Sequence, residues 1–485
     1  MPASPAALAS ISARIARLGA PAFRRVYRYD RALRRKLTPA GWLLAALAVL
    51  AAVFGLNTRE VMVYQLFGLA VGLFAVAAVA GWRLRLDLSV ARRLPQWATA
   101  GVPFDYTLTL RHRGAAVRAP LWVEDLLASP PAGRPGLASE AGNATKAAKA
   151  SEASGFAAYK VSADRTRNLF DRFVGYPRFV AYMRWRIGAR VDAVALDRLA
   201  GERQVTMRCL PLRRGVLQFE AVRVARAEPL GLLKAHVRCE LPETLLVLPR
   251  TWPVAALALP GSRRLQPGGV AFAGRIGEAE EFVGLRDYRA GDTPRRIHWK
   301  AWARLGRPVV KEYQDEFFVR HALVLDSFGE AAGSSEVFET AVALAASLVV
   351  TPRSNDSLLD LMFVEGRAYT FTQGRGLGAA AELLRVLAAL SPTPGGSFEP
   401  LAEAVALGAA RISGAICVLL AWDEPRQRMV AGLRARGLPV RVWVVGEARA
   451  DGAALPSLPL GPMASDPAGL RTVNALNLAQ ELLRP

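Results

Sequence analysis

The sequence predicts a multidomain membrane protein with an N-terminal transmembrane helical hairpin, a small β-sandwich-like domain and a C-terminal α/β domain. Three observations indicate this: two apolar runs without charge, a series of short alternating strands, and a final region in which apolar strands alternate with helices. At 485 residues the chain is long enough for two or three folded units besides a membrane segment. The expected parts are a basic N-terminal segment (1–38), the hairpin (39–83), the β domain (84–250), a junction (251–320) and the α/β domain (321–485).

The membrane segment is predicted from Ala40–Leu56 and Val61–Trp82, which carry no charge. Each run is about as long as a helix that crosses a hydrocarbon core of roughly 30 Å. Only residues 57–60 separate the runs, so the two helices must be antiparallel and the chain returns to the side from which it entered. Basic residues flank the hairpin on both outer ends, and the positive-inside rule places such flanks in the cytoplasm. We therefore expect a multi-pass protein of the inner membrane, in contact with the lipid bilayer, with both termini cytoplasmic. The basic residues are Arg24, Arg25, Arg28, Arg31, Arg34, Arg35 and Lys36 before the hairpin, and Arg83, Arg85, Arg92 and Arg93 after it.

The formal net charge of +22 comes almost entirely from arginine. Such an excess is typical of proteins that bind nucleic acid or an anionic membrane surface. It is equally typical of arginine-rich and alanine-rich coding in a GC-rich genome, and the composition alone leaves both interpretations open. The three cysteines, Cys209, Cys239 and Cys417, have no CxxC spacing, so neither a disulfide framework nor a zinc site is indicated.

The β domain is predicted from short runs with alternating or continuous apolar residues and turn residues between them. Phe104, Tyr106, Leu108 and Leu110 fall on one face of the first run. The segment from about 129 to 174 is rich in Ala, Gly, Ser and Lys, and we expect it to be a mobile insertion. The expected strands are Pro103–Leu110, Leu121–Leu126, Val205–Leu210, Val216–Val224 and Leu245–Leu248.

The α/β domain is predicted from strands that are apolar on both faces and alternate with helices, a pattern typical of a mostly parallel sheet covered by helices. Asp326 and Asp423 each follow such a strand, and ligands of these sheets usually bind at the carboxyl ends of strands. The expected strands are Ala322–Leu325, Leu358–Val364, Ala415–Leu420 and Val440–Val445, and the expected helices are Val337–Val350, Ala379–Leu390 and Pro425–Arg436.

The junction contains the most informative stretch, Glu281–Glu316. Asp292 is expected to cap a helix that runs from about Thr293 to Leu305 and ends at Gly306. Arg295, Trp299 and Trp302 would share one face of this helix, and such basic and aromatic groups can bind phosphate or stack on bases. The preferred interpretation is structural: the tryptophans belong to a core, and the arginines pair with acidic neighbours. Those neighbours are Asp292, Glu312, Asp315 and Glu316.

The run from Phe282 to Glu312 resembles the signature of a bacterial and archaeal family called domain of unknown function 58. Members of this family similarly have two N-terminal membrane helices, a small β domain, the signature and a domain like that of von Willebrand factor type A. The resemblance implies association with MoxR-type AAA ATPases and transglutaminase-like membrane proteins in chaperone-like assembly or envelope maintenance. The matching residues are Arg286, Tyr288, Gly291, Asp292, Arg296, Ile297, Trp299, Lys300, Ala303, Arg304, Val310, Lys311 and Glu312.

The type A resemblance also raises the question of a metal ion. Metal-binding domains of that kind carry Asp-x-Ser-x-Ser after the first strand, because an oxygen cluster there can hold Mg²⁺. Here Asp326 is kept, but Phe328 and Glu330 replace the two serines. Asp423 corresponds to a later aspartate of such domains. We therefore expect no metal or other cofactor, although Asp326, Glu330 and Asp423 could hold a hydrated Mg²⁺ weakly.

The predicted function is that of a non-enzymatic, membrane-anchored protein-interaction module that faces the cytoplasm. The sequence shows no nucleophile elbow, no phosphate-binding loop and no histidines at metal spacing. No catalytic residue, cofactor-binding residue or small-molecule substrate is therefore identified. His298, beside Trp299, could act in catalysis, but a packed or solvated histidine is more common. The alternatives are a membrane-associated protein that binds nucleic acid or another anion, with nucleic acid the less favoured partner, and an enzyme of unrecognised type.

Overall fold

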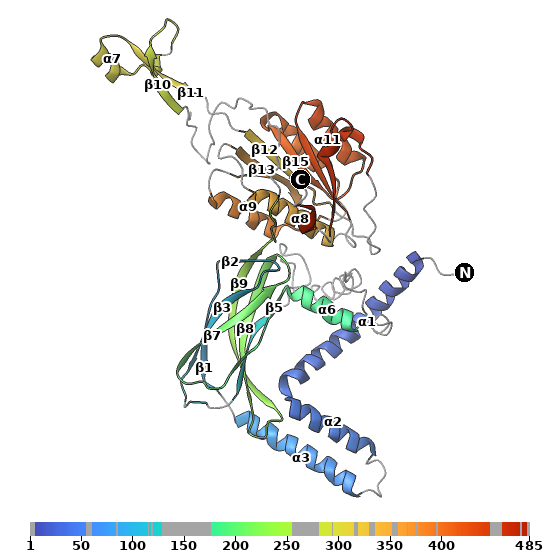
Figure 1. Ribbon diagram of the computed structural model, residues 1–485. Helices are drawn as coiled ribbons and strands as arrows, with labels where there is room; N and C mark the ends of the chain where they lie inside the picture. The colour runs from blue at the N-terminus through green and yellow to red at the C-terminus, as the bar shows by residue number, and fades with distance from the viewer. Residues whose placement is uncertain are drawn as a thin grey trace. The chain divides into compact units, whose positions relative to one another are not determined.

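The computed structural model describes residues 5–54, 61–83, 86–128, 176–254, 281–314, 319–328, 335–351, 357–446 and 458–482, apart from a few short gaps. The chain divides into two compact units, Met1–Arg250 and Thr251–Pro485, each of which is described by itself (Figure 1). The insertion expected at about 129–174 lies outside the described residues.

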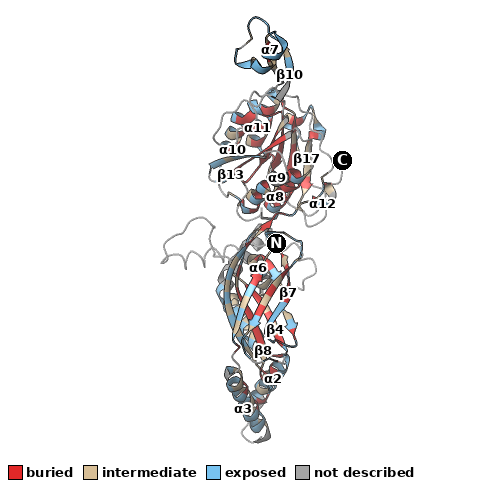
Figure 2. Ribbon diagram, turned by 90° about the vertical axis from the view of Figure 1, so that its left-hand side faces the viewer, coloured by how far each residue is buried: buried red, intermediate tan, exposed pale blue. Residues whose placement is uncertain are grey.

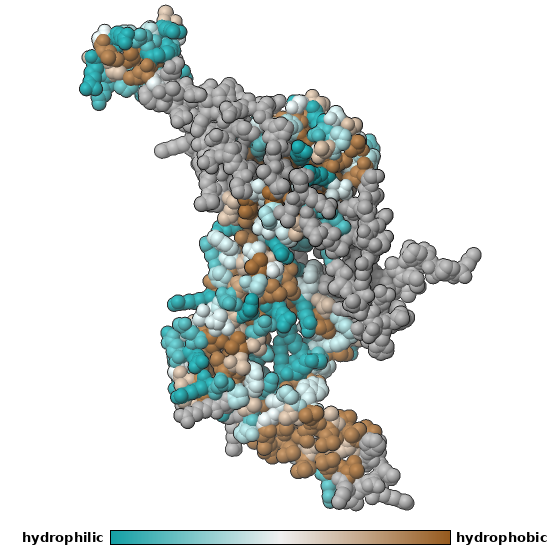
Figure 3. All heavy atoms as spheres, in the orientation of Figure 1, coloured by the Kyte–Doolittle hydropathy of each residue, from teal (hydrophilic) through white to brown (hydrophobic). Residues whose placement is uncertain are grey.

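The first unit begins with three helices, α1 (Pro5–Lys36), α2 (Pro39–Phe54) and α3 (Val61–Arg83). Helices α2 and α3 pack against each other. Within the described residues, one helix is long and apolar enough to cross a membrane, Val63–Trp82, and Pro39–Val53 is a shorter apolar helix. Figure 3 shows a continuous hydrophobic surface over this part of the chain. An apolar helix surface that the protein itself leaves uncovered is weak evidence for association with a membrane.

Two β-sheets of the first unit share one hydrophobic core. Leu108 and Met207 come from the first sheet, and Val123 and Phe219 from the second; all four side chains are buried. The alternation at 103–110 is confirmed, because every second residue of that strand points into this core. The first sheet has the antiparallel order β1 (Leu88–Arg93), β3 (Phe104–His112), β7 (Glu202–Pro211), β5 (Ala189–Val191). The second has the order β2 (Trp97–Thr99), β9 (Lys234–Leu248), β8 (Gly215–Ala227), β4 (Leu121–Leu127), β6 (Val194–Leu196), with β2 parallel to β9.

A short helix, α6 (Tyr176–Ile187), packs its Phe179 against Phe23 and Tyr27 of α1. Thr38, just before α2, donates its hydroxyl to the carbonyl of Gly231 in the loop between β8 and β9. These contacts join the N-terminal helices to the β domain within one unit.

An ion pair lies in the interior of the β domain. Arg92 on β1 donates from Nε and Nη2 to the carboxylate of Asp125 on β4, at 2.9 and 2.7 Å, and both side chains are fully buried. The hydroxyl of Tyr106 donates to the same carboxylate at 2.7 Å, and the ring of Phe219 lies 4.7 Å from the guanidinium. Burial and then the Asp125 charge raise the pKa of Tyr106, so its hydroxyl stays protonated as a donor.

The second unit contains a six-stranded sheet in the order β14-β13-β12-β15-β16-β17 (Figure 1). All neighbours are parallel except the edge strand β14, which is antiparallel to β13. The predicted mostly parallel sheet is therefore present, with one antiparallel strand at its edge. The strands are β12 (Val319–Leu325), β13 (Ser357–Glu365), β14 (Arg367–Gln373), β15 (Gly414–Leu419), β16 (Val440–Gly446) and β17 (Leu470–Asn474).

Helices cover both faces of this sheet. On β12, Leu323 and Leu325 belong to one buried cluster, whereas Ala322 and Val324 belong to the other. The strand is thus buried on both sides, as its continuous apolar sequence predicts. Figure 2 shows buried residues, in red, along the sheet and helices of this unit. Helices α8 (Ser335–Val350), α9 (Leu377–Ala389) and α12 (Leu478–Glu481) pack on the first face, and α10 (Glu399–Gly408) and α11 (Glu424–Ala435) on the second.

Candidate functional site

The carboxyl edge of the six-stranded sheet is built around Asp326, which directly follows β12 and is fully buried. Its carboxylate accepts hydrogen bonds from the backbone N–H groups of Phe328 at 2.9 Å and Leu420 at 3.0 Å. It also accepts from Nε of Arg426 at 2.7 Å. A buried carboxylate needs such partners, because an unpaired charge in the interior is strongly unfavourable.

Arg426, in the first turn of α11, joins this carboxylate to that of Asp423. Its Nη1 donates to Asp423, and its Nη2 donates to the carbonyl oxygen of Phe328 at 3.2 Å. The guanidinium carbon lies 4.7 Å from the centre of the Phe398 ring. Burial acts to lower the pKa of Arg426, but the hydrogen bonds and charges of Asp326 and Asp423 together raise it above the ordinary value. Arg426 is therefore a permanent cation between the two aspartates.

These residues do not fit a divalent metal ion. Both aspartates are bound to a guanidinium, and the Ser327 hydroxyl donates to the carbonyl of Val364. Phe328 stands where the Asp-x-Ser-x-Ser pattern has its first serine, and its ring packs edge-on against Phe398 with centroids 6.0 Å apart. Glu330, the third candidate, lies outside the described residues. Within the part of the chain that the structure describes, no group of three or more His, Cys, Asp or Glu side chains is arranged to hold a metal.

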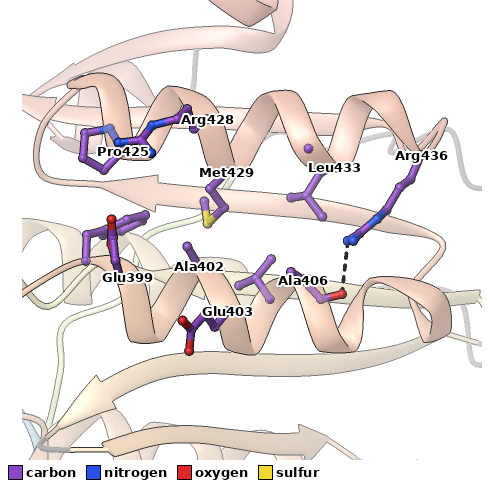
Figure 4. Close-up of a pocket in the computed structure, with 12 residues that line it drawn as sticks. Glu399, Ala402, Glu403, Ala406, Pro425, Arg428, Met429, Leu433 and Arg436 are labelled. Atoms are coloured by element: carbon purple, nitrogen blue, oxygen red, sulfur yellow. Dashed lines mark hydrogen bonds between the residues drawn. The ribbon is translucent and has the colours of Figure 1, made fainter.

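A groove of about 290 Å³ runs between α10 and α11 and begins at Phe398 and Pro425, next to Arg426 (Figure 4). Its floor is apolar, with Val405, Met429 and Leu433. Acidic side chains line the α10 side and basic side chains line the α11 side: Glu399 and Glu403 on the first, Arg428 and Arg436 on the second. Arg436 donates to the carbonyl of Ala406 at 3.1 Å and bridges the two helices at the far end. A groove with an apolar floor and charged rims suits a protein partner better than a polar metabolite.

The signature residues form a separate small module. The strands β10 (Glu281–Asp287) and β11 (Val309–Gln314) pair antiparallel, with a short 3₁₀ turn, η2 (Pro294–Arg296), and a helix, α7 (Trp299–Leu305), between them. Arg286 binds Asp292 through two hydrogen bonds of 2.7 Å. The turn between them needs a positive φ of 108° at Gly291, which explains a glycine at that place. The hydrogen bonds from Arg286 and from the Arg289 amide lower the pKa of Asp292 to about 2.

The helix predicted from Thr293 to Leu305 is shorter and is capped differently. Asp292 is not the N-cap, because its carboxylate is held by Arg286 and by the amide of Arg289. The α-helix begins at Trp299, and His298 is its N-cap, with Nδ1 accepting from the amide of Ala301 at 3.0 Å. The role of His298 in the structure is thus to cap a helix. Gly306 ends the helix in the left-handed conformation, as predicted.

The interpretation of the tryptophans as core residues is wrong. Trp299 is 63% exposed, Trp302 is half-buried, and the helix that carries them buries none of its residues. The two indoles stack on each other, with centroids 5.2 Å apart and an interplanar angle of 19°. A helix of two turns on a two-stranded sheet has too little area around it to enclose both rings.

The other signature residues are distributed over this module. Arg295 lies in the 3₁₀ turn and therefore does not continue the helical face of Trp299 and Trp302. Of the predicted acidic partners, Asp292 pairs with Arg286, and Asp315 and Glu316 lie outside the described residues. Four of the remaining signature residues are exposed: Tyr288, Arg296, Lys300 and Arg304. Lys311 on β11 is half-buried, and Glu312 lies on the same strand with its side chain not described.

Sequence reasoning missed Arg426 and Phe398, which complete the carboxyl edge. Arg426 is 100 residues away from Asp326 in the chain, and nothing in the local sequence distinguishes it from the other arginines of α11. The spacing of three residues from Asp423 to Arg426 was the one available signal, because residues three apart on a helix are neighbours.

Residues 284–421 match the model of the protein family described as "Protein of unknown function DUF58". The uncharacterised protein YeaD of Bacillus subtilis (strain 168) is 30% identical over 138 residues, which cover 28% of this chain and only 33% of that relative. Among solved structures, proximal thread matrix protein 1 from the mussel byssus shares 12% identity, with a TM-score of 0.26 over 34% of this chain and 44% of that one. An aerotolerance-related membrane protein from Bacteroides fragilis NCTC 9343 shares 14% identity, with a TM-score of 0.24 over 34% of this chain and 94% of that one. Similarity to structures at this level carries no functional argument, so the assignment rests on the sequence matches. Residues 284–421 therefore match the DUF58 family, which confirms the resemblance of the signature in this part of the chain.

Proposed function

We propose that this protein is a non-enzymatic, membrane-anchored interaction protein whose α/β domain binds a protein partner at the carboxyl edge of β12 and β15. One observation carries the proposal: the charged groups at this edge, Asp326, Arg426 and Asp423, pair with one another beside an open groove with an apolar floor. Such an edge provides shape and polarity for recognition rather than a reactive group. Asp423, 46% exposed, is the charged member that a partner can reach.

The α/β domain is in this proposal a von Willebrand factor type A-like domain that works without its metal. Support comes from the parallel sheet with helices on both faces and from the position of Asp326 after β12. In a metal-dependent domain a divalent cation completes the edge, whereas here the guanidinium of Arg426 supplies the positive charge from within the chain. Binding to this edge should then be insensitive to chelators.

The proposed partner is a MoxR-type AAA ATPase, acting with a transglutaminase-like membrane protein in chaperone-like assembly or envelope maintenance. This choice rests on the resemblance of the signature residues. The groove between α10 and α11 supports a helical segment of the partner as the bound element, because its apolar floor and oppositely charged rims match the sides of an amphipathic helix.

In this proposal the protein is anchored in the inner membrane by a transmembrane hairpin of α2 and α3, with both termini in the cytoplasm. The uncharged sequence of both helices and the arginines that flank them support this arrangement. Reporter fusions at Met1 and Pro485 test it: we expect activity from a cytoplasmic reporter at both ends, and activity from a periplasmic reporter at either end would contradict it.

The experiment for the interaction is a pull-down of purified MoxR-type ATPases by the full-length protein in detergent, with and without EDTA. We expect equal recovery in both conditions and reduced recovery with Asp423→Ala and with Arg428→Glu. Arg203→Glu, an exposed arginine of β7 in the other unit, is the matched control. Recovery that EDTA abolishes and Mg²⁺ restores would contradict the metal-free edge, and equal recovery by all variants would contradict the site.

A second candidate function, binding of a nucleic acid or another anion at the membrane, is favoured by the stacked tryptophans and nearby cations of the signature module. Retention on DNA that falls steeply with salt would support it.

A further inference from the structure

The signature module presents large hydrophobic side chains to solvent. Trp299 is 63% exposed, Leu305 56%, Leu285 43% and Tyr288 38%. In Figure 3 hydrophobic and strongly hydrophilic residues lie side by side on this module. Exposed apolar groups that are bordered by polar ones mark interaction sites in soluble domains, and Trp and Tyr are the side chains that most often dominate binding energy.

The order of residues on α7 places cations and apolar groups on opposite sides of Trp299. Lys300 and Arg304 are four residues apart and therefore share one side of the helix. Trp302 and Leu305 are three residues apart and share the other side, where the indole of Trp302 stacks on that of Trp299. Trp299 is thus the centre of a surface with a basic flank and an apolar flank. We call Trp299, Lys300, Trp302, Arg304 and Leu305 the signature surface.

The positive charge of this surface is not neutralised within the described part of the module. Asp292 is occupied by Arg286, and Asp287 pairs with Arg307 at 3.1 Å. Lys300 and Arg304 are exposed, and among the described residues neither of them forms an ion pair. Charge complementarity therefore requires a negatively charged ligand.

The apolar part of the surface distinguishes between classes of anionic ligand. Proteins that bind single-stranded nucleic acid offer separate aromatic faces to successive bases. Here the two indoles stack on each other, so each ring keeps only its outer face, and Trp302 is half-buried. The exposed side chains Leu285 and Leu305 of the module are aliphatic. Aliphatic and aromatic contacts surrounded by arginine and lysine are typical of protein interfaces.

We propose that the signature surface binds an acidic segment of a partner protein, with an apolar or aromatic side chain of that segment against Trp299 and its carboxylates against Lys300 and Arg304. The surface shares no residue with the carboxyl edge of the sheet, so this inference does not depend on the function proposed above. It assigns a binding role to the part of the family signature that the structure leaves exposed.

The test uses the full-length protein in nanodiscs of neutral phospholipid and measures fluorescence anisotropy with three labelled probes. These are a short peptide of glutamates interspersed with leucine and phenylalanine, the same peptide with lysine in place of glutamate, and a short oligothymidylate. We expect the acidic peptide to bind and the other two to bind at least about tenfold more weakly, a difference of about 1.4 kcal/mol.

Variants locate the binding on the surface. Trp299→Ala and the double variant Lys300→Glu, Arg304→Glu should each weaken binding of the acidic peptide by about tenfold or more, whereas Trp299→Phe should keep most of it. The double variant Arg203→Glu, Arg208→Glu on β7 makes the same change of charge at exposed positions of the other unit and should leave binding unchanged. Hydrogen exchange of β10 and β11 in each variant checks that the module is folded.

Three results would overturn the proposal. The first is an acidic peptide that does not bind, or that binds all folded variants equally. The second is tighter binding of oligothymidylate that the signature variants abolish, which would make the surface a nucleic-acid site. The third is binding to nanodiscs that contain phosphatidylglycerol, but not to the acidic peptide, which would make it a lipid site.

Discussion

The protein buries the same arrangement of an arginine, an aspartate and a phenylalanine ring in two different domains. In the β domain, Arg92 binds Asp125 at 2.7 Å over the ring of Phe219 at 4.7 Å. In the α/β domain, Arg426 binds Asp326 at 2.7 Å over the ring of Phe398, also at 4.7 Å. The clusters differ in their remaining partners. In the first, Tyr106 and the carbonyl of Leu241 complete the pair, and the carboxylate of Glu243 lies 3.5 Å from the guanidinium. In the second, the guanidinium donates a direct hydrogen bond to Asp423, which is 46% exposed.

This difference indicates what each cluster does. Arg92 lies on a strand and binds Asp125 on β4 and the carbonyl of Leu241 on β9, so its main contribution is to hold strands together. Its second carboxylate, that of Glu243, is a more distant partner at 3.5 Å. Arg426 instead connects a buried carboxylate to one that a partner molecule can reach. The chemistry is shared, but in the second cluster an exposed carboxylate is hydrogen-bonded directly to the buried guanidinium, and the proposed function assigns a binding role to that carboxylate.

The largest effect should come from breaking the interior cluster. Asp125→Ala removes the carboxylate that accepts two hydrogen bonds from the buried guanidinium of Arg92 and leaves it only the more distant Glu243 at 3.5 Å. It should destabilise the β domain by about 3 to 5 kcal/mol. Urea unfolding of the full chain in detergent measures this loss, and hydrogen exchange of β3 and β8 should locate it in the first unit. Tyr106→Phe, which removes one hydrogen bond to the same carboxylate, is the milder control. Equal midpoints for Asp125→Ala and wild type would show that the ion pair does not hold the two sheets together.

A somewhat smaller effect is expected for Asp326→Ala, about 3 kcal/mol, because Asp423 still neutralises Arg426 when the buried partner is lost. Hydrogen exchange should be faster in β12 and β15 and unchanged in the β domain. A loss as large as that of Asp125→Ala would mean that Asp423 does not share the charge of Arg426.

Asp423→Ala should separate stability from binding. The side chain is 46% exposed and caps α11 by accepting from the Arg426 amide, so its loss should cost about 1 kcal/mol. Binding of the ATPase partner should nevertheless fall more than with Asp326→Asn, which leaves the exposed carboxylate in place. The comparison requires thermal unfolding and pull-down on the same preparations; a variant with unchanged binding would place the partner elsewhere.

The smallest effect is expected for the half-buried Arg286–Asp292 pair of the signature. The pKa of Asp292 is lowered from 3.8 to about 2. Pairing with Arg286 therefore stabilises the folded module above about pH 4, and this stabilisation is lost as the pH falls towards 2. A carbon-13 NMR titration of the aspartate carboxyls, assigned with Asp292→Asn, measures this directly. In Arg286→Ala the titration should move up towards the ordinary range; an unchanged midpoint would show that Arg286 is not its cause.

The sequence was sufficient for the elements whose pattern is local. The strand β3 and the strands β12, β15 and β16 were predicted to within a few residues of their observed bounds. Burial of one face produces an alternating apolar pattern, and burial of both faces produces a continuous apolar run. The edge strand β14 was missed, since Arg367–Gln373 mixes polar and aromatic residues. An antiparallel edge strand is only partly covered and carries a weaker signal.

The candidate sites were harder to predict, because they depend on pairings between distant parts of the chain. Asp326 and Asp423 were placed correctly at strand ends, but the arginine that joins them has no local signature. Asp292 has the sequence features of a helix cap, yet its pairing with Arg286 competes with that role and His298 takes it. Trp299 has the composition of a core residue and lies on a module too small to bury it.

The central claim, that Arg426 takes the place of a metal ion at the carboxyl edge, is tested most directly by isothermal titration of Mg²⁺ into the full-length wild-type protein. The account predicts no saturable binding at this edge, because the oxygens of Asp326 and Asp423 are already engaged by the guanidinium and by backbone amides. Saturable Mg²⁺ binding that Asp423→Ala abolishes would contradict it.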